Sequence, residues 1–314
     1  MTEVFDVIIV GGGPAGIAAG LYAARMNLRT VLVDRGPLGG QLHNTELIED
    51  YPGIESILGP ELAEKMGAHA RKFGLDAREY VAVSSIEADG DDRVVRFADS
   101  QDELRAPAVI MAAGGLPRKL DVPGEESLAG RGVSYCAVCD GAFFKNEVLA
   151  VVGGGDAALE EGDFLTRYAS KVHIIHRRNE FRAQPILQDR ARANPKIDFI
   201  LDAQVKEITG NGKVSSIRYA SKGGEVDLPV GGVFIFVGFT PNSDILKIHV
   251  KHDANGYIVT GPDMKTSVPG VWAIGDVRAQ LTKQIATAVG DGTTAAVSAS
   301  AFVSAVRDLQ RAGA

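Results

Sequence analysis

Short, uninterrupted apolar runs, each followed by a glycine-rich turn, dominate the hydrophobic pattern of this chain. Residues 5–10 form one such run, which leads into the turn 11–16 and then into a helical pattern over 17–25. Residues 148–152 form a second run, followed by the turn 153–158 and a helical pattern over 159–168. Continuous β-branched runs are typical of parallel strands buried on both faces. The sequence therefore predicts two strand–turn–helix units of the same kind.

Further buried runs extend each unit into a larger sheet. Strands are predicted over 30–33 and 108–111 for the first unit, and over 172–175 and 232–236 for the second. From residue 271 the pattern predicts one more strand and then a long alanine-rich helix over about 287–309. We expect an α/β fold of two Rossmann-like, three-layer nucleotide-binding domains, the second inserted into the first. The expected domains are 1–115 with 245–314, and 116–244.

Composition and charge limit the class of protein. The 314 residues are 45% hydrophobic and 23% charged, as in ordinary globular proteins. A formal net charge of −7 argues against nucleic acid as a partner. No apolar run approaches the roughly 18 residues of a membrane span, and residues 1–6 lack the basic segment of a secretory signal. With only two cysteines in the chain, we expect a cytoplasmic protein that does not bind membranes.

The first glycine turn has the composition of a dinucleotide-binding site. Glycines at this turn let the backbone approach a pyrophosphate, whose charge the following helix N-terminus favours. Asp34 ends the next strand, where a Rossmann unit places the residue that reads the ribose, and its carboxylate suits an unphosphorylated ribose, as in FAD or NAD. The alternative is a tight turn without a ligand. The candidate residues at this site are Gly11, Gly13, Pro14, Ala15, Gly16 and Asp34.

The second glycine turn predicts a different nucleotide. At the ribose-reading position the acidic residue is replaced by His176, Arg177 and Arg178, with Arg182 a turn further on. Guanidinium groups bind a 2′-phosphate bidentately, so this site is expected to prefer NADPH to NADH. The alternative is a solvated basic face. The candidate residues in the turn itself are Gly153, Gly155, Asp156, Ala157 and Ala158.

The only two cysteines, Cys136 and Cys139, lie between the two glycine turns. Closing so short a loop removes little unfolded-state entropy, so the pair suits a reversible dithiol better than a structural disulfide. Asp140 is a candidate for moving a proton to or from the leaving sulfur, and a helix cap is its alternative role. One CxxC with few histidines is half a metal site at most, so we expect no metal.

Two nucleotides and a dithiol together indicate a flavin. NADPH delivers a hydride, and a flavin accepts it at one ring position and passes electrons to sulfur from another. This assigns FAD to the first site. Near the end of the chain, Gly275 and Asp276 follow a strand, and Asp276 is a candidate for the ribityl chain of FAD. Lys283 precedes Gln284 and Ile285, whose amides are candidates to open a helix towards the flavin ring.

With these residues, the chain resembles the low-molecular-weight thioredoxin reductases of bacteria, in the class II pyridine nucleotide-disulfide oxidoreductase family. The resemblance runs end to end and includes the segment around Gln41, the CxxCD motif and the arginine cluster. It implies a homodimer that reduces thioredoxin with NADPH through FAD, and a second domain that rotates relative to the first. It also implies that Gln41 is a cofactor-binding residue. Ala113, Asp50–Tyr51 and Lys283 depart from the common pattern of Thr, Asn–Trp and Arg.

Three other functions fit parts of the sequence. One is a related flavoprotein that takes electrons from ferredoxin or another donor, and another keeps NADPH but reduces a different acceptor protein. The third is a redox-sensing subunit without turnover. Arg131, Phe143 and Phe144 flank the cysteines and are candidates for a docking surface, with the hydrophobic core as the alternative place for the two Phe side chains.

Overall fold

The computed structural model describes residues 2–45 and 47–312. Residues 1, 46, 313 and 314, which fall in the expected first domain, lie outside the described residues. The chain forms two compact units, one made of residues 1–116 and 240–314 and the other of residues 117–239. The second unit is therefore inserted between the two parts of the first.

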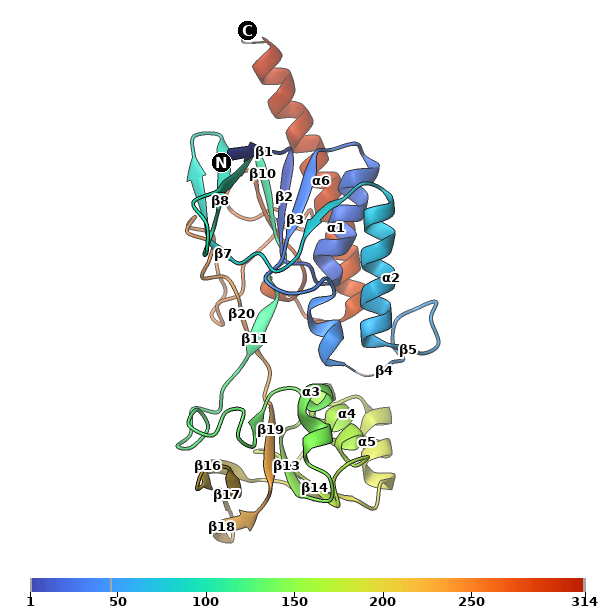
Figure 1. Ribbon diagram of the computed structural model, residues 1–314, viewed down its shortest axis with the longest axis vertical. Helices are drawn as coiled ribbons and strands as arrows, with labels where there is room; N and C mark the ends of the chain where they lie inside the picture. The colour runs from blue at the N-terminus through green and yellow to red at the C-terminus, as the bar shows by residue number, and fades with distance from the viewer. Residues whose placement is uncertain (1, 46, 313–314) are drawn as a thin grey trace. The chain divides into compact units, whose positions relative to one another are not determined.

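The first unit contains a five-stranded parallel sheet with helices on one face (Figure 1). In spatial order its strands are β21 (Val271–Ala273), β10 (Ala108–Met111), β2 (Val7–Val10), β3 (Thr30–Val33) and β6 (Asp76–Arg78). The helices are α1 (Pro14–Arg25), α2 (Gly59–Lys72) and α6 (Ile285–Ala312). Val7 and Ile9 pack towards α1 and α6 in one buried cluster. Ile8 and Val10 alternate with them and pack into a cluster on the opposite face.

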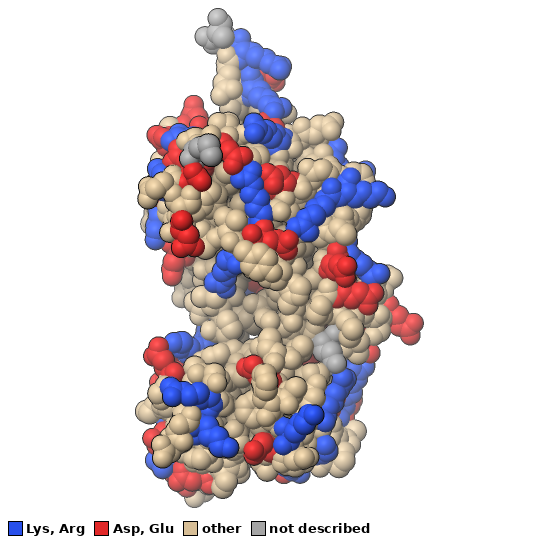
Figure 2. Space-filling model, in the orientation of Figure 1, with Lys and Arg blue, Asp and Glu red and all other residues tan. Residues whose placement is uncertain are grey.

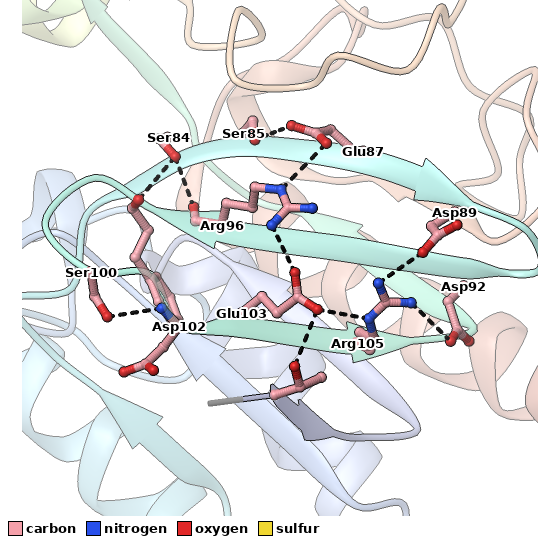
Figure 3. Close-up of polar contacts among 12 residues, drawn as sticks. Ser84, Ser85, Glu87, Asp89, Asp92, Arg96, Ser100, Asp102, Glu103 and Arg105 are labelled. Carbon is pink, nitrogen blue, oxygen red and sulfur yellow. Dashed lines mark hydrogen bonds and ion pairs between the residues drawn. The ribbon is translucent and has the colours of Figure 1, made fainter.

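A second sheet covers that opposite face. It has the order β1 (Thr2–Val4), β9 (Glu103–Ala106), β8 (Asp92–Phe97) and β7 (Val83–Asp89). Its outer face carries a cross-strand ladder of ion pairs (Figure 3): Arg96 contacts Glu103 at 2.7 Å and Glu87 at 3.4 Å, and Arg105 contacts Glu103 at 2.9 Å and Asp89 at 2.8 Å. Exposed pairs contribute only about 0–1 kcal/mol each. The ladder keeps this face polar and internally paired.

The second unit repeats the same three layers. Its parallel sheet has the order β12 (Val133–Ser134), β19 (Gly232–Phe236), β13 (Val148–Gly153), β14 (Lys171–Ile175) and β15 (Ile197–Ile200). Leu149 and Val151 pack against the helices, while Ala150 and Val152 pack against a second sheet. The helices are α3 (Ala137–Asp140), α4 (Asp156–Leu165) and α5 (Pro185–Ala193), and the second sheet is β16 (Gln204–Gly210), β17 (Val214–Ser221) and β18 (Gly224–Pro229).

Short elements complete the chain. They are β4 (Leu47–Ile48), β5 (Ile57–Leu58), the paired strands β11 (Gly115–Pro117) and β20 (Phe239–Pro241), and the 3-10 turns η1 (Gly40–Asn44), η2 (Gly141–Phe143) and η3 (Gly275–Val277). Among the described residues, no helix combines the length and apolar character needed to cross a bilayer. Acidic and basic side chains are interspersed on the face drawn in Figure 2.

Most predicted strands and helices are present, with shifted ends. The strands over 30–33, 108–111 and 232–236 are as predicted. The strand predicted over 5–10 begins only at Val7, because Asp6 lies in the bend before it and accepts the backbone N–H of Arg29 at 2.7 Å. The first helix begins earlier than predicted, at Pro14, where a fixed φ favours the first helical position.

Candidate functional site

The first glycine turn is shaped by close backbone contacts on one side and open space on the other. Gly11 has φ +112°, and a Cβ there would lie 2.3 Å from the carbonyl oxygen of Ala112, which directly follows the neighbouring strand β10. A Cβ on Gly16 would lie 1.9 Å from the carbonyl oxygen of Gly11. Gly13 caps α1, and no atom lies within 4 Å of the Cβ position there. The turn therefore leaves room for a ligand group at the N-terminus of α1, where free N–H groups favour a phosphate.

Asp34 lies beside this turn, as predicted from its position at the end of β3. Its Oδ2 accepts the N–H of Gly12 at 2.5 Å, and its Oδ1 accepts the N–H of Gly36 at 2.7 Å. A carboxylate offers about four acceptor positions, so each oxygen keeps one for a further donor. The two bonds aim the carboxylate next to the turn, where it suits the hydroxyl groups of a ribose.

The segment around Gln41 is attached to the same turn. Gly39 donates its N–H to the carbonyl oxygen of Gly12 at 2.7 Å, and a Cβ on Gly40 would lie 3.1 Å from the Cα of Gly13. Both glycines have positive φ, at +125° and +53°, which allows this sharp approach. Gln41 follows in η1 with an exposed side chain. The structure thus brings Gln41 next to the first glycine turn.

Asp276 reaches the same region from the other end of the chain. Gly275, which precedes it, has φ +64°, and a Cβ there would lie 3.0 Å from the Cβ of Ala15 in α1. Within the described residues, the half-buried Asp276 carboxylate accepts no hydrogen bond, and burial raises its pKa, an effect that Lys283 partly opposes. Lys283 donates to the backbone oxygen of Asp276 at 2.7 Å and lies 3.8 Å from the ring centroid of Tyr257. An unfilled acceptor beside the glycine turn suits a polyhydroxyl chain.

A buried ion pair that sequence reasoning missed holds Gly275 in place. Asp291 of α6 is 8% exposed, accepts the N–H of Gly275 at 3.0 Å, and pairs with Arg278 at 3.1 Å. In the sequence, Asp291 is distinguished only as the single charged residue of the helical stretch over 285–306. Gln284 and Ile285 do open α6, as predicted, with the N–H of Gln284 donating to Thr287 Oγ1 at 3.1 Å.

The second glycine turn is built on a buried histidine. Gly154 lies against His176, whose ring atoms would be 2.3 Å from a Cβ at that position. Burial lowers the pKa of His176, a hydrogen bond to the backbone of Glu180 partly opposes this, and the nearby arginines lower the pKa further. Its Nε2 is buried and has no hydrogen-bond partner among the described residues. His176 therefore supports the turn as a neutral ring. Gly155 caps α4, and its Cβ position has no atom within 4 Å, as at Gly13.

The arginine cluster is exposed beside this turn, as its sequence position predicts. Arg177, Arg178 and Arg182 are all exposed, and the N–H of Arg182 donates to the carbonyl oxygen of Gly154 at 2.8 Å. Asp156, which is expected to contact the cofactor, binds Gln184 in this structure: Oδ1 accepts its backbone N–H at 2.8 Å, and Oδ2 accepts its Nε2 at 3.1 Å. Ala157 and Ala158 follow in the first turn of α4.

Cys136 and Cys139 form a disulfide with a Cα–Cα distance of 5.4 Å. Cys136 precedes α3, and its sulfur accepts the N–H of Cys139 at 3.1 Å. Such a hydrogen bond stabilises a thiolate when the disulfide is reduced. Cys139 is exposed and Cys136 is half-buried. Asp140 lies next to the pair at the N-cap position of η2, where its side chain makes no capping hydrogen bond.

A buried carboxylate supports the segment before Cys136. Glu125 is 2% exposed and accepts three hydrogen bonds: from the N–H of Leu120 at 3.0 Å, the N–H of Asp121 at 2.7 Å and the hydroxyl of Tyr135 at 2.6 Å. Burial, and then the bond to Glu125, raise the pKa of Tyr135, which stays a hydroxyl donor. Sequence reasoning missed this group, because nothing in its local pattern distinguishes it from an exposed glutamate.

The two phenylalanines after the cysteines have different surroundings. Phe143 is 82% exposed, whereas Phe144 packs edge-on against Phe234 with ring centroids 5.3 Å apart. The core alternative is therefore correct for Phe144 and wrong for Phe143. Arg131 is also exposed, and its guanidinium donates to the carbonyl oxygen of Ser127 at 2.8 Å.

The sequence profile of the pyridine nucleotide-disulphide oxidoreductases matches residues 5–292 of the chain. The chain belongs to this family. It is 49% identical to a thioredoxin reductase of Listeria innocua over 99% of this chain and 98% of that protein. It also resembles the crystal structure of Lactococcus lactis thioredoxin reductase, with a TM-score of 0.92 and 45% identity over 95% of this chain and 99% of that one.

These similarities confirm the predicted family and the α/β fold class, and the chain is an oxidoreductase. FAD and NADPH are the cofactors that membership of the family implies. The ferredoxin-dependent alternative is not favoured: a Clostridium acetobutylicum ferredoxin-flavin thioredoxin reductase shares only 26% identity and a TM-score of 0.55, over 97% of this chain and 99% of that one.

The residues present fit both cofactors. The room at Gly13 and the unfilled carboxylate of Asp276 suit the pyrophosphate and ribityl groups of FAD. The room at Gly155 and the exposed arginines suit the pyrophosphate and 2′-phosphate of NADPH.

Proposed function

We propose that this protein reduces the disulfide of thioredoxin with electrons from NADPH, through FAD and the Cys136–Cys139 pair. The observation that carries the proposal is the disulfide between these two cysteines, in the same unit as an exposed arginine cluster at a glycine turn. The names of the similar proteins support thioredoxin as the acceptor. FAD belongs to the first unit in this proposal, and NADPH to the second.

The residues divide the work as follows. Bound NADPH supplies a hydride, and bound FAD lets the electron pair reach sulfur. The first glycine turn, Asp34, Gln41 and Asp276 would hold FAD, and the N–H groups at the N-terminal end of α6 would stabilise negative charge on it. The second glycine turn and the arginines would hold NADPH in preference to NADH.

The cysteines carry the last step. Reduction of their disulfide consumes two electrons and two protons, and Asp140 moves one of these protons. One thiolate then attacks the thioredoxin disulfide to form a mixed disulfide, and the other cysteine resolves it, leaving reduced thioredoxin and restoring the Cys136–Cys139 bond. The N–H of Cys139 stabilises a thiolate on Cys136.

A single cysteine pair cannot contact a flavin and a bulky protein at the same time. The chain passes between its two units only at residues 116–117 and 239–240, within the paired strands β11 and β20. We therefore include in the proposal that the second unit rotates about these two crossings between a flavin-reducing and a thioredoxin-reducing state. A homodimer and a cytoplasmic location complete it, since the pair must remain reducible.

The test is Cys136→Ser and, separately, Cys139→Ser. Each variant is expected to keep its yellow FAD and its NADPH binding, and to lose thioredoxin reduction. If either variant retains full thioredoxin turnover, the dithiol mechanism is wrong. Flavin absorbance in the same samples is the control, because it reports that each variant is folded and loaded.

A further inference from the structure

The loop that carries the arginine cluster is attached to the second glycine turn at three points. The ring of His176 lies under Gly154, the N–H of Arg182 donates to the carbonyl oxygen of Gly154, and Asp156 binds Gln184. The first two contacts lie at the start and middle of the loop. The third closes its far end, at the residue that precedes α5.

The third contact is the one made by a charged side chain. Asp156 is the first residue of α4, directly after the glycine turn, and its two oxygens accept the backbone N–H and the Nε2 of Gln184 at 2.8 and 3.1 Å. One carboxylate therefore connects residues 28 positions apart in the sequence. A second hydrogen bond from the same partner restricts the direction of the contact as well as its length.

The geometry of a dinucleotide makes this connection important. The pyrophosphate and the 2′-phosphate of one nucleotide are a fixed number of bonds apart, so the glycine turn and the arginines must be held at a matching distance. A loop free to move at its far end presents the same guanidinium groups, but has to be ordered when the nucleotide binds, which weakens binding.

We propose that the Asp156–Gln184 contact is a specificity clamp, which positions Arg177, Arg178 and Arg182 for the 2′-phosphate of NADPH. The inference rests on the proposed function of the second unit as the NADPH site. Asp156 is a positioning residue in this account: it acts through the loop and the arginines.

The sign of the effect separates the clamp from simple electrostatics. Removing the negative charge of Asp156 lowers repulsion towards every phosphate nearby, so a pure charge effect predicts tighter binding of both nucleotides. Loss of the clamp predicts weaker binding of the 2′-phosphorylated nucleotide with little change for the other. Gln184→Ala removes the same contact without changing any charge, so its effect on nucleotide binding reports the contact alone.

The experiment measures binding without turnover. NADP⁺ and NAD⁺ are titrated by calorimetry into the oxidised, FAD-loaded full chain carrying Asp156→Asn, Gln184→Ala or both. The matched control is Asp189→Asn, which removes an exposed charge from α5 and a 3.7 Å pair with Arg192. We expect each clamp variant to weaken NADP⁺ binding about fivefold, the scale of one typical net hydrogen bond, with NAD⁺ unchanged. The double variant should add little to either single change.

The outcomes are distinguishable. Unchanged or tighter NADP⁺ binding in both single variants overturns the clamp, and so does an equal loss for NADP⁺ and NAD⁺. If the unaltered protein itself shows no preference for NADP⁺, the proposed function of the second site fails, before the clamp is considered. Thermal unfolding of each variant identifies any loss of nucleotide binding that comes from misfolding. If Asp156→Asn misfolds, the affinities of Gln184→Ala for NADP⁺ and NAD⁺ alone test the clamp.

Discussion

Phe143 and Phe144 are adjacent in the chain, and the structure predicts opposite effects of truncating them. Phe143 is 82% exposed, so Phe143→Ala should change the free energy of unfolding by less than about 0.5 kcal/mol. If its ring enters thioredoxin at the centre of the contact, its loss costs about 2 kcal/mol of binding. That free energy corresponds to a roughly 30-fold higher KM for thioredoxin.

Phe144→Ala provides the matched control. Its ring packs edge-on against Phe234, so truncation leaves a cavity beside the sheet. A fully buried Phe→Ala change costs about 3–5 kcal/mol, and the half-buried position of Phe144 lowers this to about 2–3 kcal/mol. We expect a clear fall in the thermal unfolding midpoint with a KM for thioredoxin close to that of the unaltered protein.

The assay measures thioredoxin reduction by NADPH over a range of thioredoxin concentrations. Ferricyanide, a small acceptor that needs no protein docking, is measured in parallel to show that the flavin half of the reaction is intact. The reasoning is refuted if Phe143→Ala leaves the KM for thioredoxin unchanged, or if it lowers the rates with both acceptors equally.

Two further predictions concern the nucleotide sites. Replacing Arg177 and Arg178 with Gln should raise the KM for NADPH at least tenfold and leave that for NADH nearly unchanged; steady-state kinetics with both nucleotides checks this, and an equal rise would contradict it. Burial raises the pKa of Asp276, so its ionised form destabilises the FAD-free fold above that pKa and the penalty disappears as pH falls below it. Asp276→Asn should therefore stabilise the FAD-free protein at neutral pH, with a gain that shrinks towards pH 4, and weaken FAD binding; a gain independent of pH would refute this.

Patterns within short segments were enough to predict the two glycine turns and the parallel strands around them. Buried β-branched runs distinguish strands such as 108–111 and 232–236 from their surroundings, and each turn lies between such a run and a helix. The second sheet of each unit, in which most strand pairs are antiparallel, was not predicted. Strands such as β8 and β17 mix polar and apolar residues, because one face is solvated.

The candidate site residues also divide into those that a local pattern can predict and those that depend on the tertiary fold. Position in a repeated unit placed Asp34 and the arginine cluster beside their turns, where the structure also has them. The partners of buried charges depend on the tertiary fold: nothing near Asp291 in the sequence indicates Arg278, and nothing near Asp156 indicates Gln184. The burial of His176 under Gly154 likewise depends on the parallel pairing of β13 with β14, whose ends bring these two residues together.

The central claim is that electrons enter from NADPH and reach a flavin in this chain. The most direct measurement mixes the purified yellow protein anaerobically with NADPH and, separately, with NADH, and follows the visible absorbance band of the flavin. The account predicts rapid bleaching with NADPH and much slower bleaching with NADH. A flavin band that persists with NADPH would contradict it, because the second glycine turn would then not deliver a hydride.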